Sequence, residues 1–128
     1  MPADAVSDLV AFAHVSDMVR SIAFYERLGF RVGDRHEHDG ELDWVLLRSS
    51  AARLMLARAS APIDPHAQAV LFYLYTPDLT QLRRRLLAAG VPAGEIRDGT
   101  PGPRREMGLS DPDGYCLMIA EIDDGPSG

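Results

Sequence analysis

The chain has 128 residues, of which 46% are hydrophobic and 25% charged, and its formal net charge is −6. These values are typical of a single folded domain, and no apolar run approaches the ~20 residues of a membrane-spanning helix. The negative charge argues against a nucleic-acid partner, because the chain has no excess of cations to neutralise phosphates. The acidic N-terminal segment does not resemble a signal peptide and Cys116 is the single cysteine, so we expect a cytoplasmic protein.

The first half of the chain is predicted to contain one helix between an apolar strand and three further strands. The first strand covers Leu9–Val15. Asp17 is suited to cap the start of a helix, and Gly29 is suited to end it. An acidic turn is expected around Gly40, and residues 60–65 are expected to link the halves. The later strands of this half are expected at Phe30–His36, Leu42–Arg48 and Arg53–Arg58.

The second half repeats the pattern. Asp78 and Gly90 follow Asp17 and Gly29 at the same spacing of 61 residues (78 − 17 and 90 − 29). The D-P-D-G stretch at 111–114 is typical of a hairpin turn. The other elements expected here are a strand at Ala69–Tyr75, a short segment at Glu95–Arg97, a Gly/Pro-rich loop at Asp98–Pro103, strands at Arg104–Leu109 and Tyr115–Ile122, and a frayed tail from Asp123. A fixed period indicates two similar halves, at about residues 9–60 and 66–123, within one domain.

Two βαβββ repeats predict an α+β fold in which paired curved sheets surround a cleft. The chain resembles the vicinal oxygen chelate superfamily, also called the glyoxalase/bleomycin-resistance/extradiol-dioxygenase fold. The resemblance rests on V-S-D-M-V-R-S-I-A-F-Y-E-R-L-G-F, on L-Y-T-P-D-L-T-Q-L-R-R-R-L-L-A-A-G-V and on the ending D-P-D-G-Y-C-L-M-I-A-E. It implies the fold more strongly than a function, because the superfamily includes lyases, epimerases, dioxygenases, thiol transferases and drug-sequestering proteins.

The resemblance also implies where a divalent metal ion would bind, through His, Gln and Glu side chains. The corresponding positions here are Val10, seven residues before Asp17, Leu71, seven before Asp78, and Met118, four after Gly114. These side chains offer neither the oxygen nor the imidazole nitrogen that such ions require. We therefore predict a metal-independent protein without a cofactor.

Strand alternation places aromatic, polar and sulfur-containing side chains on the cleft face of the predicted sheets. The candidate ligand-binding residues are Phe12, His14, Trp44, Arg48, Tyr73, Tyr75, Cys116 and Met118. The aromatic rings favour a flat, partly apolar ligand, although ordinary core packing explains them about equally well. The net charge predicts a weak preference for cationic ligands, which Arg48 and Arg104 would reverse locally.

For several side chains the sequence allows two different roles. His14 is either a displaced metal ligand, with Glu106 as the evident nearby partner, or, as we favour, a lone histidine that hydrogen-bonds a ligand or a neighbouring backbone group. Cys116 is expected to be a small buried side chain rather than an activated thiol, which would need a neighbouring base. His36 and His38 are expected at a solvated, acidic strand end rather than around an ion, and the three arginines 83–85 on a solvated helix face.

Together these observations predict a small-molecule-binding protein of the bleomycin-resistance type. It would sequester an aromatic or antibiotic-like ligand, without a metal ion, and form a homodimer. The alternative is an enzyme of the superfamily (a lyase, isomerase or dioxygenase), with a divergent metal site or with metal-free acid–base chemistry at His14 and Glu106. The apolar residues at the implied metal positions favour binding.

Overall fold

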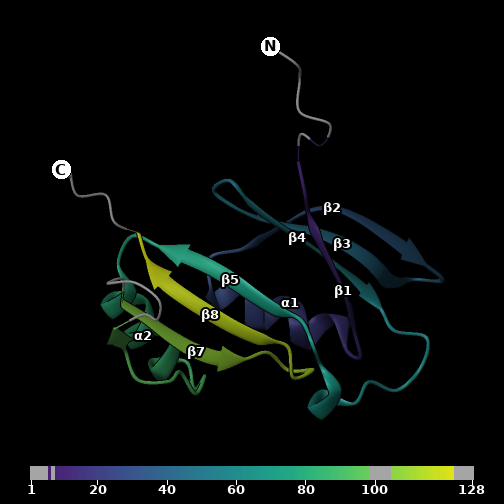
Figure 1. Cartoon of the computed structure of the whole chain (residues 1–128). Coiled ribbons are helices and arrows are strands. Elements are labelled where there is room, and N and C mark those ends of the chain that lie inside the picture. The colour runs from purple at the N-terminus through teal and green to yellow at the C-terminus, as the bar shows by residue number, and fades with distance from the viewer. Residues whose placement is uncertain (1–5, 7, 99–104, 123–128) are drawn as a thin grey trace. The chain divides into compact units, whose positions relative to one another are not determined.

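The protein, seen here as a computed structural model, forms two units, Met1–Ile63 and Asp64–Gly128. The structure describes residues 6, 8–98 and 105–122. Each unit contains one four-stranded sheet and one α-helix (Figure 1). This arrangement confirms the predicted α+β fold built from two βαβββ repeats. No helix among the described residues is long and apolar enough to cross a membrane.

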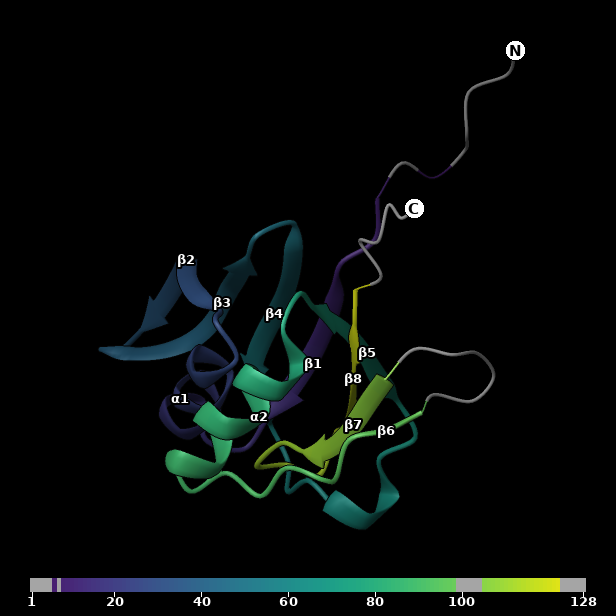
Figure 2. The ribbon, with the colours of Figure 1, turned by 90° about the vertical axis from the view of Figure 1, so that its left-hand side faces the viewer.

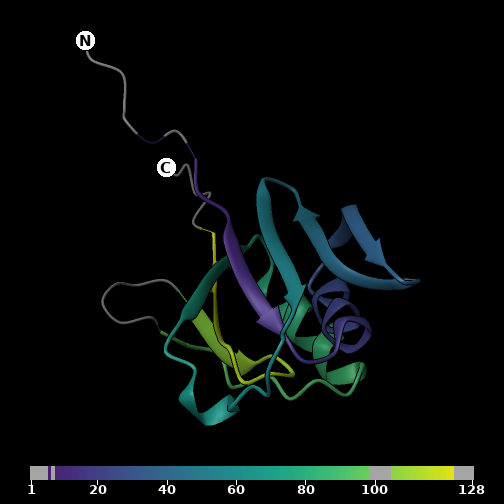
Figure 3. The same ribbon diagram turned by 90° about the vertical axis from the view of Figure 1, so that its right-hand side faces the viewer.

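The first unit contains a mixed sheet. Its elements are β1 (Ala11–Val15), α1 (Met18–Arg27), β2 (Arg31–His38), β3 (Glu41–Ser49) and β4 (Ala52–Arg58). The strand order is β1-β4-β3-β2, with β1 parallel to β4 and the other pairs antiparallel. Helix α1 lies against one face of this sheet (Figure 3). The core between them includes the fully buried side chains of Val15, Tyr25, Val45, Leu47 and Leu56.

The second unit repeats this order. After the short 3₁₀ helix η1 (Pro65–Ala67) come β5 (Leu71–Thr76), α2 (Leu79–Ala88), β6 (Arg97–Asp98), β7 (Arg105–Ser110) and β8 (Cys116–Glu121). The strand order is β5-β8-β7-β6, with β5 parallel to β8, and β6 lies beside β7 (Figure 2). Its core includes the buried side chains of Leu79, Leu82, Leu86, Met107, Leu117 and Ile119.

Both helices begin where the sequence predicts. Oδ1 of Asp17 accepts a hydrogen bond from the Arg20 backbone N–H at 3.1 Å, and Oδ1 of Asp78 accepts one from the Gln81 N–H at 3.0 Å. Each bond satisfies a backbone donor that the first helical turn leaves without a partner. The helices start 61 residues apart (79 − 18) and end 61 residues apart (88 − 27).

Both helices also end in the same way. Gly29 and Gly90 have φ values of 101° and 81°, in the left-handed region that glycine tolerates best. The N–H of Phe30 then reaches back to the Tyr25 carbonyl, and the N–H of Val91 to the Leu86 carbonyl. These bonds form the helix-ending motif that a glycine in this position predicts.

The predicted D-P-D-G hairpin turn is confirmed. The N–H of Gly114 donates to the Asp111 carbonyl at 3.0 Å. The buried carboxylate of Asp111 accepts further bonds from the N–H groups of Asp113 and Tyr115, at 2.8 and 2.9 Å. The turn joins β7 to β8 and fixes the register of the central pair of the second sheet.

Of the arginines 83–85, predicted on a solvated helix face, the first is only partly exposed and has a structural contact as well. Nε of Arg83 donates to the Gly94 carbonyl at 2.8 Å and holds the segment that follows α2, whereas Arg84 and Arg85 are exposed. The short predicted segment at 95–97 becomes β6, displaced by two residues at its start. The predicted loop lies outside the described residues from 99 onward, as do Arg104 and the predicted tail from Asp123.

Candidate functional site

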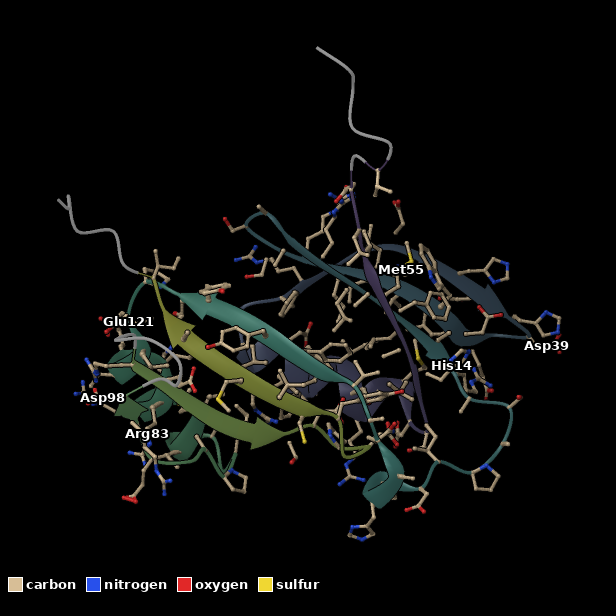
Figure 4. All side chains as sticks on the ribbon, viewed as in Figure 1. His14, Asp39, Met55, Arg83, Asp98 and Glu121 are labelled. Atoms are coloured by element: carbon tan, nitrogen blue, oxygen red, sulfur yellow. The ribbon has the colours of Figure 1, made fainter. Side chains whose placement is uncertain are left out.

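The first sheet has one face against α1 and a second face, which we call open face 1. Cross-strand pairing places one row of side chains across this face: Phe12, Met55 and Leu46. The next row contains His14, Ala57, Trp44 and His36. In Figure 4, the labelled His14 lies on β1 and the labelled Met55 on the neighbouring β4. Open face 1 therefore presents aromatic, imidazole and thioether groups side by side.

The predicted alternation of β1 is confirmed by burial. Ala13 and Val15 are 2% and 0% exposed on the helix side, whereas Phe12 is 52% exposed. The rings of Phe12 and His14 meet edge to face, with centroids 5.3 Å apart. His14 is thus an exposed side chain beside an aromatic ring, which suits a hydrogen-bonding role better than a core position.

A register shift between His36 and Glu37 brings Asp43 next to His36. Nδ1 of His36 donates a hydrogen bond to Oδ1 of Asp43 at 2.7 Å, which lowers the pKa of that carboxyl group below its ordinary value. His38 pairs with Asp39 at 3.3 Å, and both histidines are exposed. The two imidazoles contact acids at a solvated strand end, as the sequence predicts.

The second sheet also has a face opposite its helix, which we call open face 2. Three rows of paired residues cross it: Leu71, Cys116 and Ser110; Tyr73, Met118 and Gly108; and Tyr75, Ala120 and Glu106. Tyr73 and Tyr75 are 49% and 57% exposed. Their rings lie 5.5 Å apart and are tilted by 45°. Open face 2 is therefore largely aromatic and apolar along its edge strand.

Open face 2 also carries a hydrogen bond between Tyr73 and Glu106 and the thiol of Cys116. The Tyr73 hydroxyl donates a hydrogen bond to Oε2 of Glu106. Cys116 is exposed, so the prediction of a buried cysteine is wrong. It is the first residue of β8 and pairs with Leu71 and Ser110, which are also exposed. A cysteine at the end of a sheet lacks the covering side chains that bury such residues in a core.

The residues at the implied metal positions do not fit a divalent ion. Val10 precedes β1, Leu71 is the first residue of β5, and Met118 lies in the middle of β8. Two aliphatic side chains and one soft thioether are poor ligands for hard cations. Within the described part of the chain, no group of three or more His, Cys, Asp or Glu side chains is arranged to hold a metal ion.

The eight predicted ligand-binding residues therefore divide between the two sheets. Phe12, His14, Trp44 and Arg48 belong to open face 1, and Tyr73, Tyr75, Cys116 and Met118 belong to open face 2.

Three further side chains of open face 1, Arg31, Arg53 and Met55, are not among the predicted site residues. Arg53 and Met55 are placed by the two-residue turn between β3 and β4, which pairs Arg48 with Arg53, and Arg31 is placed by the pairing of β2 with β3. The sequence predicts a turn of small residues at Ser49–Ala52 but not its exact register, because Ser50 adopts a positive φ of 55° that usually favours glycine or asparagine.

Comparison with known proteins gives one family match. The sequence model of the family described as Glyoxalase/Bleomycin resistance protein/Dioxygenase superfamily matches residues 9–119. No curated protein matches the chain.

Several solved structures share the fold. A bleomycin resistance determinant encoded on the transposon Tn5 is 21% identical, with a TM-score of 0.77 over 92% of this chain and 99% of that one. A bleomycin-binding protein complexed with bleomycin is 22% identical, with a TM-score of 0.73 over 91% and 99%. TnmS3, an antibiotic binding protein from Streptomyces sp. CB03234, is 24% identical, with a TM-score of 0.74 over 93% and 98%.

Proposed function

Because the chain belongs to the glyoxalase/bleomycin resistance protein/dioxygenase superfamily, we propose that it binds and sequesters a small aromatic or antibiotic-like molecule. The observation that carries this proposal is the exposure of Phe12, Tyr73 and Tyr75, each about half accessible on an open sheet face. Large rings gathered at a surface are typical of ligand and partner contacts. The similar structures of a bleomycin-binding protein and of an antibiotic-binding protein support the same class of function.

The chemistry of both open faces suits a flat ligand. Aromatic rings offer stacking surfaces, and the thioethers of Met55 and Met118 offer polarizable groups that adapt to irregular shapes. The Met118 side chain lies over Gly108 of β7, because a Cβ atom on this glycine would be in ordinary contact, at 3.8 Å, with the Met118 methyl carbon. His14 on open face 1 and Glu106 on open face 2 are the sparse polar groups that would orient a molecule bound to the respective face.

We propose that this binding needs no metal ion. The proposal rests on the apolar side chains of Val10, Leu71 and Met118 at the positions where the family resemblance implies ligands. The alternative of acid–base catalysis by His14 and Glu106 has less support. Glu106 already accepts the hydrogen bond of Tyr73, so its carboxylate is engaged within its own sheet.

We also propose a cytoplasmic homodimer. A lone cysteine is typical of reducing compartments, and symmetric dimers are the commonest assemblies that cover exposed apolar surface. Sedimentation at micromolar concentrations should give twice the 14.0 kDa mass of the chain, and a monomer would contradict this assembly.

A thermal-shift screen on chelator-treated protein tests the proposed function. The panel should contain bleomycin and planar aromatic compounds, each titrated to saturation. We expect at least one compound to raise the melting temperature, with weaker effects in the Phe12→Ala and Tyr75→Ala variants. Val19→Ala is the matched control, because Val19 is an exposed apolar residue of α1, the helix that covers the opposite face of the first sheet.

Two results would contradict the proposal. One is a saturable shift that appears only after Zn, Ni, Mn or Fe is added. The other is chemical conversion of the bound compound, which would favour the enzyme alternative.

A further inference from the structure

Three arginines lie side by side across open face 1. Arg31 of β2 pairs with Arg48 of β3, and Arg48 pairs with Arg53 of β4. Directly paired residues point to the same face of a sheet, with Cβ atoms about 4.5–5.5 Å apart. Arg48 alternates with Trp44 and Leu46, so these three arginines, the arginine row, share the face that carries the predicted ligand-binding residues.

The arginine row is only partly neutralised. Arg53 forms an ion pair with Asp8. Within the described residues, neither Arg31 nor Arg48 has an acidic group at ion-pair distance, and both are exposed. Like charges directly opposite each other in a sheet are destabilising. The arrangement therefore has a cost in the free protein that an anion would remove.

Gly33 helps to position Arg48. A Cβ atom on Gly33 would lie 3.4 Å from Nε and 3.8 Å from Cδ of Arg48. The Arg48 side chain therefore crosses β2 above the glycine, toward the strand that carries Arg31, instead of extending straight into solvent. A larger residue at position 33 would push this side chain away.

An apolar row lies next to the arginine row. Met55 is two residues from Arg53 along β4, a distance of about 7 Å, and is partly exposed. Leu46, which pairs with Met55, is only 6% exposed, so Met55 forms the accessible part of this row. Phe12 pairs with Met55 and extends this surface to β1. Open face 1 thus changes from cationic to apolar over the length of a small ring system.

We propose that the arginine row binds the carboxylate of a small organic acid whose apolar body lies on Phe12 and Met55. A guanidinium group matches a carboxylate with two parallel hydrogen bonds. The net charge of −6 favours cationic ligands in general, but the local field at this row has the opposite sign. This inference rests on the proposed function and specifies the chemical class of ligand.

Calorimetric titration with naphthoate and its neutral analogue naphthamide tests the inference. We expect naphthoate to bind more tightly than naphthamide. Arg48→Gln should weaken naphthoate binding by about tenfold or more, because a charge-assisted hydrogen bond is lost. It should leave naphthamide binding almost unchanged. Arg84→Gln removes the same charge from an exposed site on α2 and should have little effect on either compound.

Equal affinity for the two compounds, or equal effects of Arg48→Gln and Arg84→Gln, would overturn the inference. Absence of binding by both compounds would count against the proposed function. The NMR signal of the Arg48 Nε–H group then decides the inference separately. Benzoate should shift it saturably, without shifting the Arg84 signal. An unmoved Arg48 signal, or an equal response to inorganic phosphate, would overturn the assignment of an organic acid.

Discussion

The Tyr73 hydroxyl reaches Glu106 across the intervening strand β8, and this hydrogen bond fixes an exposed ring on open face 2. A double-mutant cycle with Tyr73→Phe and Glu106→Ala should give a coupling free energy of about 0.5–1.5 kcal/mol in chemical denaturation. Strictly additive costs would show that the bond does not stabilise the fold in solution.

The two helix caps should matter more than the exposed helix surface. Asp17→Ala and Asp78→Ala each remove an observed bond to the first turn and should each lower the free energy of unfolding by about 0.5–2 kcal/mol. Arg84→Ala changes an exposed side chain and should stay within about 0.5 kcal/mol of neutral. A loss at Arg84 as large as that at Asp78 in the same denaturation series would place this helix face in an interface.

Gly114 is predicted to be the less replaceable of two glycines with positive φ. Gly114 and Gly40 have φ values of 87° and 80°, so alanine should cost about 1–2 kcal/mol at either position. A Cβ atom at Gly114 would also lie 2.6 Å from Cβ of Pro65, whereas nothing lies within 4 Å of one at Gly40. Gly114→Ala should therefore lower stability by about 1–3 kcal/mol more than Gly40→Ala. Similar melting temperatures for the two variants would mean that η1 moves away freely.

The contact between His36 and Asp43 predicts a pH dependence of stability. The hydrogen bond from His36 lowers the pKa of Asp43 below its ordinary value of 3.8. A carboxyl group with a lowered pKa stabilises the folded state above its unfolded pKa, and this contribution is lost as the pH falls through the folded pKa. Asp43→Asn should therefore be less stable than the native protein near neutral pH. The difference should shrink below about pH 4, as the carboxyl group becomes protonated in both states. A difference that does not depend on pH would contradict the effect of this contact.

Local chemistry accounts for the parts of the fold that the sequence predicts well. Asp17 and Gly29 bracket the first helix, Asp78 and Gly90 bracket the second, and each acts through bonds within a few residues of itself. The faces of β1 and β5 follow from simple alternation because both strands are regular.

The arginine row could not be predicted in the same way. It depends on the register of three strands, which is set by an unusual turn at Ser50 and by register shifts in β2. The hydrogen bond of Arg83 could not be predicted either, because its partner is the carbonyl of Gly94 in a segment without regular structure. Exposure of Cys116 depends on its place at the start of a strand, which composition does not indicate.

The most direct test of the central claim is the fluorescence of Trp44, the single tryptophan, during titration with each compound that raises the melting temperature. Trp44 belongs to open face 1, beside Ala57 and His36 in the cross-strand pairing. We predict saturable quenching, and weaker binding in Trp44→Leu with an unchanged circular dichroism spectrum. Trp44 fluorescence that stays unchanged with every stabilising compound would contradict the assignment of open face 1 as a ligand-binding surface.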